Sequence, residues 1–391
     1  MRSTRASDRE GSGCPVTETR DCSGSGGATR RAFLATGAAT VMASVGGCLS
    51  GDGGSTTPET ESVPSVRYRH RYKRSGLDAA PNDAGVELGI WEEEGVEVDF
   101  VTSSGSQAAV KSVAQGNDEF GNAEISALLR QMQQDSSLRI IGQVIDPMAG
   151  IVSVGEAGIE DWTDLEGKVI GRYPFGATGP LAMAAMSKEG GDPDAVETRN
   201  MQPGSEEQLL MQGKIDAAVT YFPQAVARLQ TNGYETNVLI ISDVLENLGV
   251  SLFTRKQVID EQPETVNKFV RGWLRAHKVF ATDLDRVIEA YRDNVPQFNE
   301  ELARMTVGPI YASRVPPEDV GTSRGKGWTP PEQLRTTQSV FREAGLLEQD
   351  LSLEEYYTNE YIEGNQELAV ETAKAYYDAL EANYDIGPNY V

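Results

Sequence analysis

The chain has 391 residues, with 35 basic and 59 acidic side chains and a formal net charge of −24 at pH 7. A surface this acidic excludes nucleic acid as a partner, because backbone phosphates attract positive charge. Only 10 of the 35 basic residues are lysine, and acid excess with few lysines resembles proteins of salt-loving microbes.

Residues 29–48 have the pattern of an export signal. Arg30 and Arg31 form a twin-arginine pair followed by Phe-Leu, the spacing used to export folded proteins. The uncharged stretch that follows is shorter than the roughly 20 residues of a membrane span. Two glycines precede Cys48, as at a lipoprotein cleavage site, so we expect Cys48 to be the first mature residue and to carry a lipid. A chance arginine pair before a plain signal peptide is the alternative.

Removal of residues 1–47 would take away six arginines and four acids. The mature chain would then have 29 basic and 55 acidic residues and a net charge of −26. Together with the export signal, this predicts a haloarchaeal lipoprotein; an ordinary acidic secreted protein is the alternative. Cys14 and Cys22 would be removed and Cys48 lipidated, so the mature domain would have no thiol, disulfide or cysteine-based metal site.

Residues 48–64 are rich in Gly, Ser, Thr, Glu and Pro, which predicts a flexible tether. From residue 65 onward, segments with the alternating apolar pattern of a strand are followed by segments with helical periodicity. This order is typical of a parallel sheet flanked by helices. In a first lobe, strands are predicted at 66–72, 96–101, 120–123 and 138–145, and helices at 84–93, 107–115 and 125–133.

The same rhythm returns in a second lobe. Its strands are predicted at 168–172, 199–202, 215–220 and 238–241, and its helices at 180–188, 205–212 and 224–232. After residue 242 the pattern is mostly helical, most clearly at 263–280. The predicted fold class is therefore α/β with two lobes, each a mostly parallel sheet flanked by helices.

Ligands of parallel α/β sheets bind beyond the carboxyl ends of the strands. Two turns of small residues occupy such positions, one in each lobe, and their hydroxyl and backbone N–H groups are suited to an anion or a polar group. Ordinary helix capping is the alternative, although one turn in each lobe favours a shared cleft. The turns consist of Ser103, Ser104, Gly105 and Ser106, and of Phe175, Gly176, Ala177 and Thr178.

The only dense basic run of the mature chain is residues 67–74, at the end of the first predicted strand. Its Arg71, Lys73 or Arg74 would pair with an anionic ligand, and Tyr72 would stack on a ring. A solvated patch that offsets local acidity is the alternative. Two other strands add Asn122 and Tyr221 as candidate ligand contacts; Tyr221 is as well suited to a plain core.

Signals for catalysis are poor. The chain has two histidines, His70 and His277, in distant segments, and no pair has metal-ligand spacing. No nucleophile elbow, phosphate-binding loop or complete dinucleotide fingerprint occurs. We therefore expect no catalytic residue, no metal, no cofactor and no enzymatic activity.

Five loose motifs occur in an order that resembles a known family. They lie at residues 84–101, 105–116, 162–171, 212–217 and 253–264. Their order resembles type II periplasmic solute-binding proteins of ABC transporters, the family for nitrate, sulfonate, taurine and thiamine-pyrimidine precursors. The resemblance implies two lobes that close on a small solute and dock on a permease.

The resemblance also implies a domain division with two hinge crossings. Lobe I would comprise residues 65–149 and 243–391, the latter with C-terminal helices, and lobe II residues 150–242. The turns at 103–106 and 176–178 match the family's ligand-contacting turns. The partners would be a small solute, an ABC permease with its ATPase, and the outer face of the cell membrane through the lipid on Cys48. We expect an extracytoplasmic monomer.

One departure concerns the solute. Pyrimidine-binding relatives often have a tryptophan-rich strand end and a histidine before the Ala-Gly of the first helix. Here the strand end is Arg71-Tyr72-Lys73 and Asp83 precedes Ala84, which leaves the anionic solutes open. The alternatives are an enzyme of pyrimidine-precursor metabolism on the same fold, whose cysteine-rich motif this mature chain lacks, and a scaffold or sensor that has lost its ligand.

Overall fold

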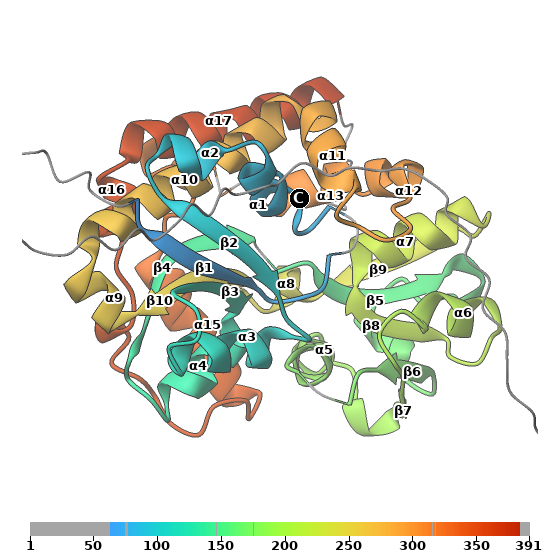
Figure 1. Ribbon diagram of the computed structural model, residues 1–391. Helices are drawn as coiled ribbons and strands as arrows, with labels where there is room; N and C mark the ends of the chain where they lie inside the picture. The colour runs from blue at the N-terminus through green and yellow to red at the C-terminus, as the bar shows by residue number, and fades with distance from the viewer. Residues whose placement is uncertain are drawn as a thin grey trace, which may run out of the picture. The chain divides into compact units, whose positions relative to one another are not determined.

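The computed structural model describes residues 63–74, 77–145, 147–174, 176–314, 316 and 318–383. All of them belong to one compact unit. Two five-stranded sheets organise this unit, and Figure 1 shows helices around both. Within the described ranges, no helix has the length and apolar character needed to cross a membrane.

The first sheet has the strand order β2-β1-β3-β10-β4. Its strands are β1 (Ser65–His70), β2 (Glu97–Thr102), β3 (Phe120–Glu124), β4 (Leu138–Ile145) and β10 (Val250–Arg255). Strand β1 is parallel to both β2 and β3, whereas β10 is antiparallel to both β3 and β4. Four strands therefore run one way, with β10 inserted between two of them in the opposite direction.

The second sheet has the order β7-β6-β8-β5-β9. Its strands are β5 (Ala149–Val154), β6 (Val169–Arg172), β7 (Glu197–Asn200), β8 (Ala217–Tyr221) and β9 (Thr236–Ile240). Here β6 is parallel to β7 and β8, and β5 is antiparallel to β8 and β9. Each sheet thus has the same arrangement of four aligned strands and one reversed strand, so the prediction of mostly parallel sheets is confirmed.

The α-helices are α1 (Ala80–Glu87), α2 (Ile90–Glu93), α3 (Ser106–Ala114), α4 (Ile125–Met132), α5 (Thr178–Lys188), α6 (Glu206–Met211), α7 (Phe222–Thr231), α8 (Ile241–Val244), α9 (Lys256–Glu261), α10 (Pro263–Thr282), α11 (Leu284–Arg292), α12 (Glu300–Met305), α13 (Val307–Ala312), α14 (Glu318–Ser323), α15 (Pro331–Glu343), α16 (Glu360–Glu363) and α17 (Gln366–Asn383). Helices α4, α7, α8 and α9 begin at the residue after a strand ends, and the others follow a loop or another helix. Long helices α10 and α17 pack side by side over the first sheet (Figure 1).

Several sequence-based boundaries are corrected. The helix predicted at 84–93 begins four residues earlier and is two helices, because Gly89 adopts a left-handed conformation between α1 and α2. The strand predicted at 66–72 ends at His70, which leaves Arg71 and Tyr72 beyond it. Strands β5 and β10 were not predicted; β10 lies in the segment after residue 242, which is otherwise mostly helical, as predicted.

The apolar core forms around both sheets. One cluster lies between β1, β2 and the helices α1, α10 and α17, with the fully buried Trp91 and Trp273 among its largest side chains. A second cluster includes residues of both sheets, such as Ile140 of β4 and Ile151 of β5. The carboxyl ends of the parallel strands project beyond these cores, and the polar residues described next lie there.

Candidate functional site

The ends of three parallel strands bring polar residues to one edge of the first sheet. Because β1 is parallel to β2 and β3, the residues that follow or end these strands lie at the same edge. They are Arg71 after β1, Ser103 after β2 and Glu124 at the end of β3.

Asn122 is fully buried and orders the residues around it. Its Oδ1 accepts a hydrogen bond from the Arg71 backbone N–H at 2.9 Å, so its Nδ2 faces the other way and lies 3.0 Å from both Tyr68 Oη and His70 Nδ1. His70 Nδ1 is therefore the acceptor, and the proton of the neutral ring is on Nε2. Nε2 lies 3.2 Å from Asp78 Oδ2. Burial lowers the pKa of His70, although Asp78 opposes this effect.

Asp78 contacts two arginines, Arg71 and Arg314, that are far apart from each other in the sequence. Its Oδ2 is 3.1 Å from Arg71 Nη2, and its backbone carbonyl accepts a hydrogen bond from Arg314 Nη2 at 2.9 Å. Arg314 Nη2 is also 3.6 Å from Asp78 Oδ1. Burial by itself would raise the pKa of Asp78, but Arg71, His70 and Arg314 together hold that pKa far below its usual range. Asp78 is therefore a carboxylate.

Both arginines retain unused donors. Arg71 is 2% exposed and Arg314 is 1% exposed, and in each side chain Nε and Nη1 are buried without a hydrogen-bond partner among the described residues. A buried donor without a partner costs about 1–3 kcal/mol, and more when it is charged. Donors of this kind are suited to an acceptor that comes from outside the chain.

Glu124 lies on the solvent side of Arg71. Its Oε1 is 3.4 Å from Arg71 Nε, and 40% of its side chain is exposed. Burial nevertheless raises the pKa of Glu124, against the opposing effect of Arg71. The Glu124 carboxyl group is thus partly open to solvent and lies beside a buried guanidinium.

Tyr221 brings the second sheet to the same place. It ends β8, its hydroxyl donates to Met148 Sδ at 3.2 Å, and burial raises its pKa. Its electrostatic environment includes Asp78 and Arg71, both beside the first sheet. His70, Arg71, Asp78, Asn122, Glu124, Arg314 and Tyr221 are called the polar cluster below.

Tyr72 borders the polar cluster on its exposed side. It is 44% exposed, its ring centroid lies 5.3 Å from Arg71 Cζ, and the Ser106 side chain is near its hydroxyl. Ser106 Oγ in turn accepts a hydrogen bond from the Glu124 backbone N–H at 3.1 Å. An exposed ring over a buried guanidinium offers a stacking surface next to charged groups.

The edge of the second sheet has a separate polar network. Glu206 accepts hydrogen bonds from Tyr173 at 3.0 Å, from Thr220 at 3.4 Å and from the Gly204 backbone at 2.7 Å. The donors and acceptors of this network satisfy one another. It therefore supports the end of β8 without offering the free donors that the polar cluster has.

The structure brings five of the sequence-predicted site residues together. Arg71, Tyr72, Asn122 and, through Glu124, Ser106 are connected by the contacts above, and Tyr221 is near enough for the charges of Asp78 and Arg71 to act on its pKa. Ser103, Ser104 and Gly105 form the turn before α3, and Gly176, Ala177 and Thr178 lie at the beginning of α5. Phe175, the export residues Arg30 and Arg31, and Cys48 lie outside the described residues. The roles of all these residues stay predictions.

The basic run is mostly paired within the protein. Arg67 lies 3.1 Å from Asp99, and Arg69 binds the buried Asp118 through two hydrogen bonds. Arg74 Nε and Nη2 donate to the Asp83 carboxylate at 2.9 and 2.7 Å. Arg74 is thus occupied by Asp83, and Arg71 is the arginine of this run with buried free donors.

Three members of the polar cluster were not identified from the sequence. Asp78, Glu124 and Arg314 belong to no motif, and the contacts of Arg314 with Asp78 and of Glu124 with Arg71 join residues that are far apart in the sequence. Arg314 lies just beyond α13, 236 residues from Asp78. The chain has 59 acidic residues, and only the fold shows which of them face an arginine.

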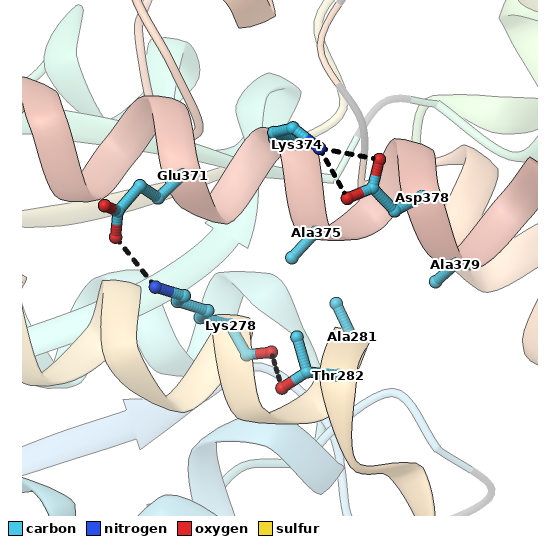
Figure 2. A pocket seen from close by; sticks show the side chains of 8 residues that line it. All are labelled: Lys278, Ala281, Thr282, Glu371, Lys374, Ala375, Asp378 and Ala379. Carbon is cyan, nitrogen blue, oxygen red and sulfur yellow. Dashed lines mark hydrogen bonds and ion pairs between the residues drawn. The ribbon is translucent and has the colours of Figure 1, made fainter.

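Two shallow hollows lie elsewhere, along the groove between α10 and α17, and Figure 2 shows the first. Its charged residues pair with one another: Lys278 with Glu371 at 2.7 Å and Lys374 with Asp378 at 2.7 Å. These hollows are lined by satisfied surface pairs and are not the candidate site. In the described part of the chain, no group of three or more His, Cys, Asp or Glu side chains is placed to hold a metal ion.

Comparisons with known proteins agree with this architecture. A family model described as NMT1/THI5 like matches residues 79–283. The riboflavin-binding protein RibY of Chloroflexus aurantiacus is 24% identical over 204 residues, which are 51% of this chain and 58% of that protein. The chain thus matches less than two thirds of the length of this relative.

Solved structures show the fold. The alkanesulfonate-binding protein SsuA from Xanthomonas axonopodis pv. citri, bound to MOPS, has a TM-score of 0.58 at 14% identity, covering 75% of this chain and 98% of SsuA. The periplasmic nitrate-binding protein NrtA from Synechocystis PCC 6803 has a TM-score of 0.56 at 9% identity, covering 84% of this chain and 91% of NrtA. The predicted periplasmic-binding-protein fold is confirmed.

Proposed function

This chain belongs to the NMT1/THI5-like family, and on that premise we propose that it is the solute-binding component of an ABC importer. The observation that carries the proposal is the polar cluster. Buried guanidinium groups with free N–H donors lie beside the first sheet, and their charges act on the pKa of Tyr221 at the end of β8 in the second sheet. A solute held there contacts both sheets, which couples its binding to their relative position.

The charges of the polar cluster favour a neutral ring over a small anion. Arg71 and Arg314 are balanced by the carboxylate of Asp78 and by Glu124 when it is ionised. Nitrate, sulfonate or taurine would have to compete with these acids for the same arginines. A planar ring with carbonyl acceptors and N–H donors satisfies both kinds of group, and Tyr72 and Tyr221 supply aromatic surface. We therefore propose a pyrimidine- or flavin-type solute.

The cellular setting is part of the proposal. Export through the Arg30–Arg31 signal and a lipid on Cys48 would keep the protein on the outer face of a haloarchaeal membrane. Residues 65–149 and 243–391 would form one lobe and residues 150–242 the other, with the closed monomer docking on the permease. Replacement of Cys48 by serine should release the protein into the medium; a C48S protein that stays with the membrane would contradict the anchor.

Solute binding can be tested directly with the purified protein in high salt. Riboflavin, a hydroxymethylpyrimidine, taurine, an alkanesulfonate and nitrate are compared by thermal unfolding and calorimetry. A solute at 100 times its Kd should stabilise the folded state by about 2.7 kcal/mol. We expect stabilisation by one of the ring compounds; a lack of response to all five would refute the proposal. The solute should be recovered unchanged, since turnover would favour the enzyme alternative.

A pair of tyrosine variants locates the solute. Tyr221→Ala should weaken binding about tenfold, because the aromatic contact contributes on the order of 1 kcal/mol or more. Tyr234→Ala is the matched control, because Tyr234 lies just before β9 begins, at the opposite edge of the same sheet. Equal losses in both variants would place the solute elsewhere.

A further inference from the structure

We propose that Glu124 determines solute selectivity by excluding oxyanions from Arg71 and by accepting an N–H group of the solute. This inference rests on the proposed function and adds the residue that sets its specificity. Glu124 belongs to none of the sequence motifs. Its position is set by three independent contacts of its backbone and side chain.

The backbone of Glu124 is fixed. The residue ends β3, pairs with Val250 of β10, and donates its backbone N–H to Ser106 Oγ at 3.1 Å. It is also the N-cap residue of α4, but its side chain makes no capping hydrogen bond. An aspartate at an N-cap ordinarily accepts a hydrogen bond from the first turn of its helix, whereas the longer glutamate is not among the preferred N-cap residues. Here it is directed to Arg71 instead.

The contact between Glu124 and Arg71 is incomplete. Oε1 lies 3.4 Å from Nε, yet Nε makes no hydrogen bond and Nη1 also lacks a partner. Asp78 already occupies Nη2 of the same guanidinium at 3.1 Å. The remaining donors of Arg71 therefore lie next to a carboxylate that is 40% exposed. A group that reaches these donors from solvent has to approach Glu124 as well.

The chemistry of this approach discriminates between solutes. A nitrate or sulfonate oxygen that binds Arg71 would lie within several ångströms of the Glu124 carboxylate, and like charges at that separation repel each other strongly beside a buried guanidinium. A ring in which a carbonyl lies beside an N–H donates to Glu124 while its carbonyl accepts from Arg71. The same pair of residues therefore repels one class of solute and binds the other.

The test exchanges the carboxylate for an amide of the same size. In Glu124→Gln we expect the affinity for an alkanesulfonate to rise roughly ten- to hundredfold, because the repulsive charge is removed. The affinity for the ring solute should fall about tenfold. Glu97→Gln is the matched control: it removes the same charge from the exposed first residue of β2, at the opposite edge of the sheet. Glu124→Asp keeps the charge and should keep the rejection of sulfonate.

The outcomes separate this inference from the proposed function. A wild-type protein that binds a ring solute, with unchanged selectivity in Glu124→Gln, would overturn the role of Glu124 alone. Sulfonate binding as tight in the wild type as in Glu124→Gln would also overturn it, while the importer function would stand. No binding of any solute by wild type, Glu124→Gln or Glu97→Gln would overturn the proposed function itself.

Discussion

Among substitutions in the polar cluster that keep the size of the side chain, Asp78→Asn should lower the stability of the protein most. The substitution keeps the volume and the backbone carbonyl that accepts from Arg314, but removes the charge that faces Arg71 at 3.1 Å and Arg314 at 3.6 Å. Asp78 is 13% exposed, and both arginines are nearly inaccessible. Glu124 is then the remaining carboxylate of the polar cluster beside Arg71.

The magnitude follows from the geometry. Removal of one partner from a buried ion pair typically costs 3–5 kcal/mol, because the other charge stays buried without compensation. We expect a loss near 3 kcal/mol, since the carbonyl bond to Arg314 and the contact with Glu124 persist. A loss of this size is a large part of the 5–15 kcal/mol by which folded proteins are usually stable.

Urea unfolding at constant high salt and pH 7 measures this loss. The matched control is Asp285→Asn, which breaks an exposed pair with Arg304 in which the Asp285 side chain is 83% exposed. Exposed pairs contribute about 0–1 kcal/mol. A loss below 1 kcal/mol for Asp78→Asn, equal to that of the control, would refute the assignment of Asp78 as a buried counter-ion.

The dependence of stability on pH below 5 gives a second measurement of the contribution of Asp78. The pKa of Asp78 is lowered in the folded state, so its contribution to stability is present above the unfolded pKa of about 3.9 and is lost as the pH falls below that value. The stability difference between wild type and Asp78→Asn should therefore shrink as the pH is lowered from 5 toward 2. A difference that stays constant over this range would contradict the pKa argument.

Three further predictions concern stability. Gly272→Ala should destabilise the fold by about 1–3 kcal/mol or more, because a Cβ at this position would overlap the buried ring of Trp91; Gly179→Ala, with ordinary contacts in α5, should be neutral or stabilising in the same urea titration. Burial lowers the pKa of His277 far below 6.5, so the contribution of His277 to stability falls as the pH drops below about 6.5. The loss of stability between pH 7 and 5 should therefore be smaller in His277→Gln than in the wild type. Glu124→Gln should leave the solute-free protein equally or more stable, because burial raises the pKa of Glu124; clear destabilisation would argue for a structural role.

The regular βα rhythm of the fold could be predicted from the sequence, and the reversed strands could not. Most predicted strands and helices occur within a few residues of their expected positions. Strands β5 and β10 are short apolar runs buried on both sides. Such runs lack the alternation that identifies a half-buried strand, and their antiparallel pairing depends on partners far along the chain. Strand β10, for example, pairs with β4, more than 100 residues earlier.

The residues of the candidate site likewise include some that could be predicted from the sequence and some that could not. Arg71, Tyr72 and Tyr221 were identified because they stand at strand ends, a position that sequence periodicity reveals. Asp78 and Arg314 lie in connecting segments, where periodicity gives no information. Their importance comes from a tertiary contact, the hydrogen bond from Arg314 to the Asp78 carbonyl at 2.9 Å. Local sequence patterns therefore locate the edge of the sheet, and only the folded chain shows the charges that meet there.

The free donors of Arg71 and Arg314 lower the stability of the solute-free protein and should strengthen the binding of a solute that has acceptor groups. Four buried N–H positions lack partners among the described residues, and each such group lowers the stability of the solute-free protein. A solute that supplies acceptors removes this penalty in addition to its own contacts. Binding should therefore stabilise the folded protein more than the aromatic contacts with Tyr72 and Tyr221 alone would do. A ring analogue without carbonyl groups should keep the stacking and lose this extra stabilisation, and equal thermal shifts for the two rings would show that the arginines do not contact the solute.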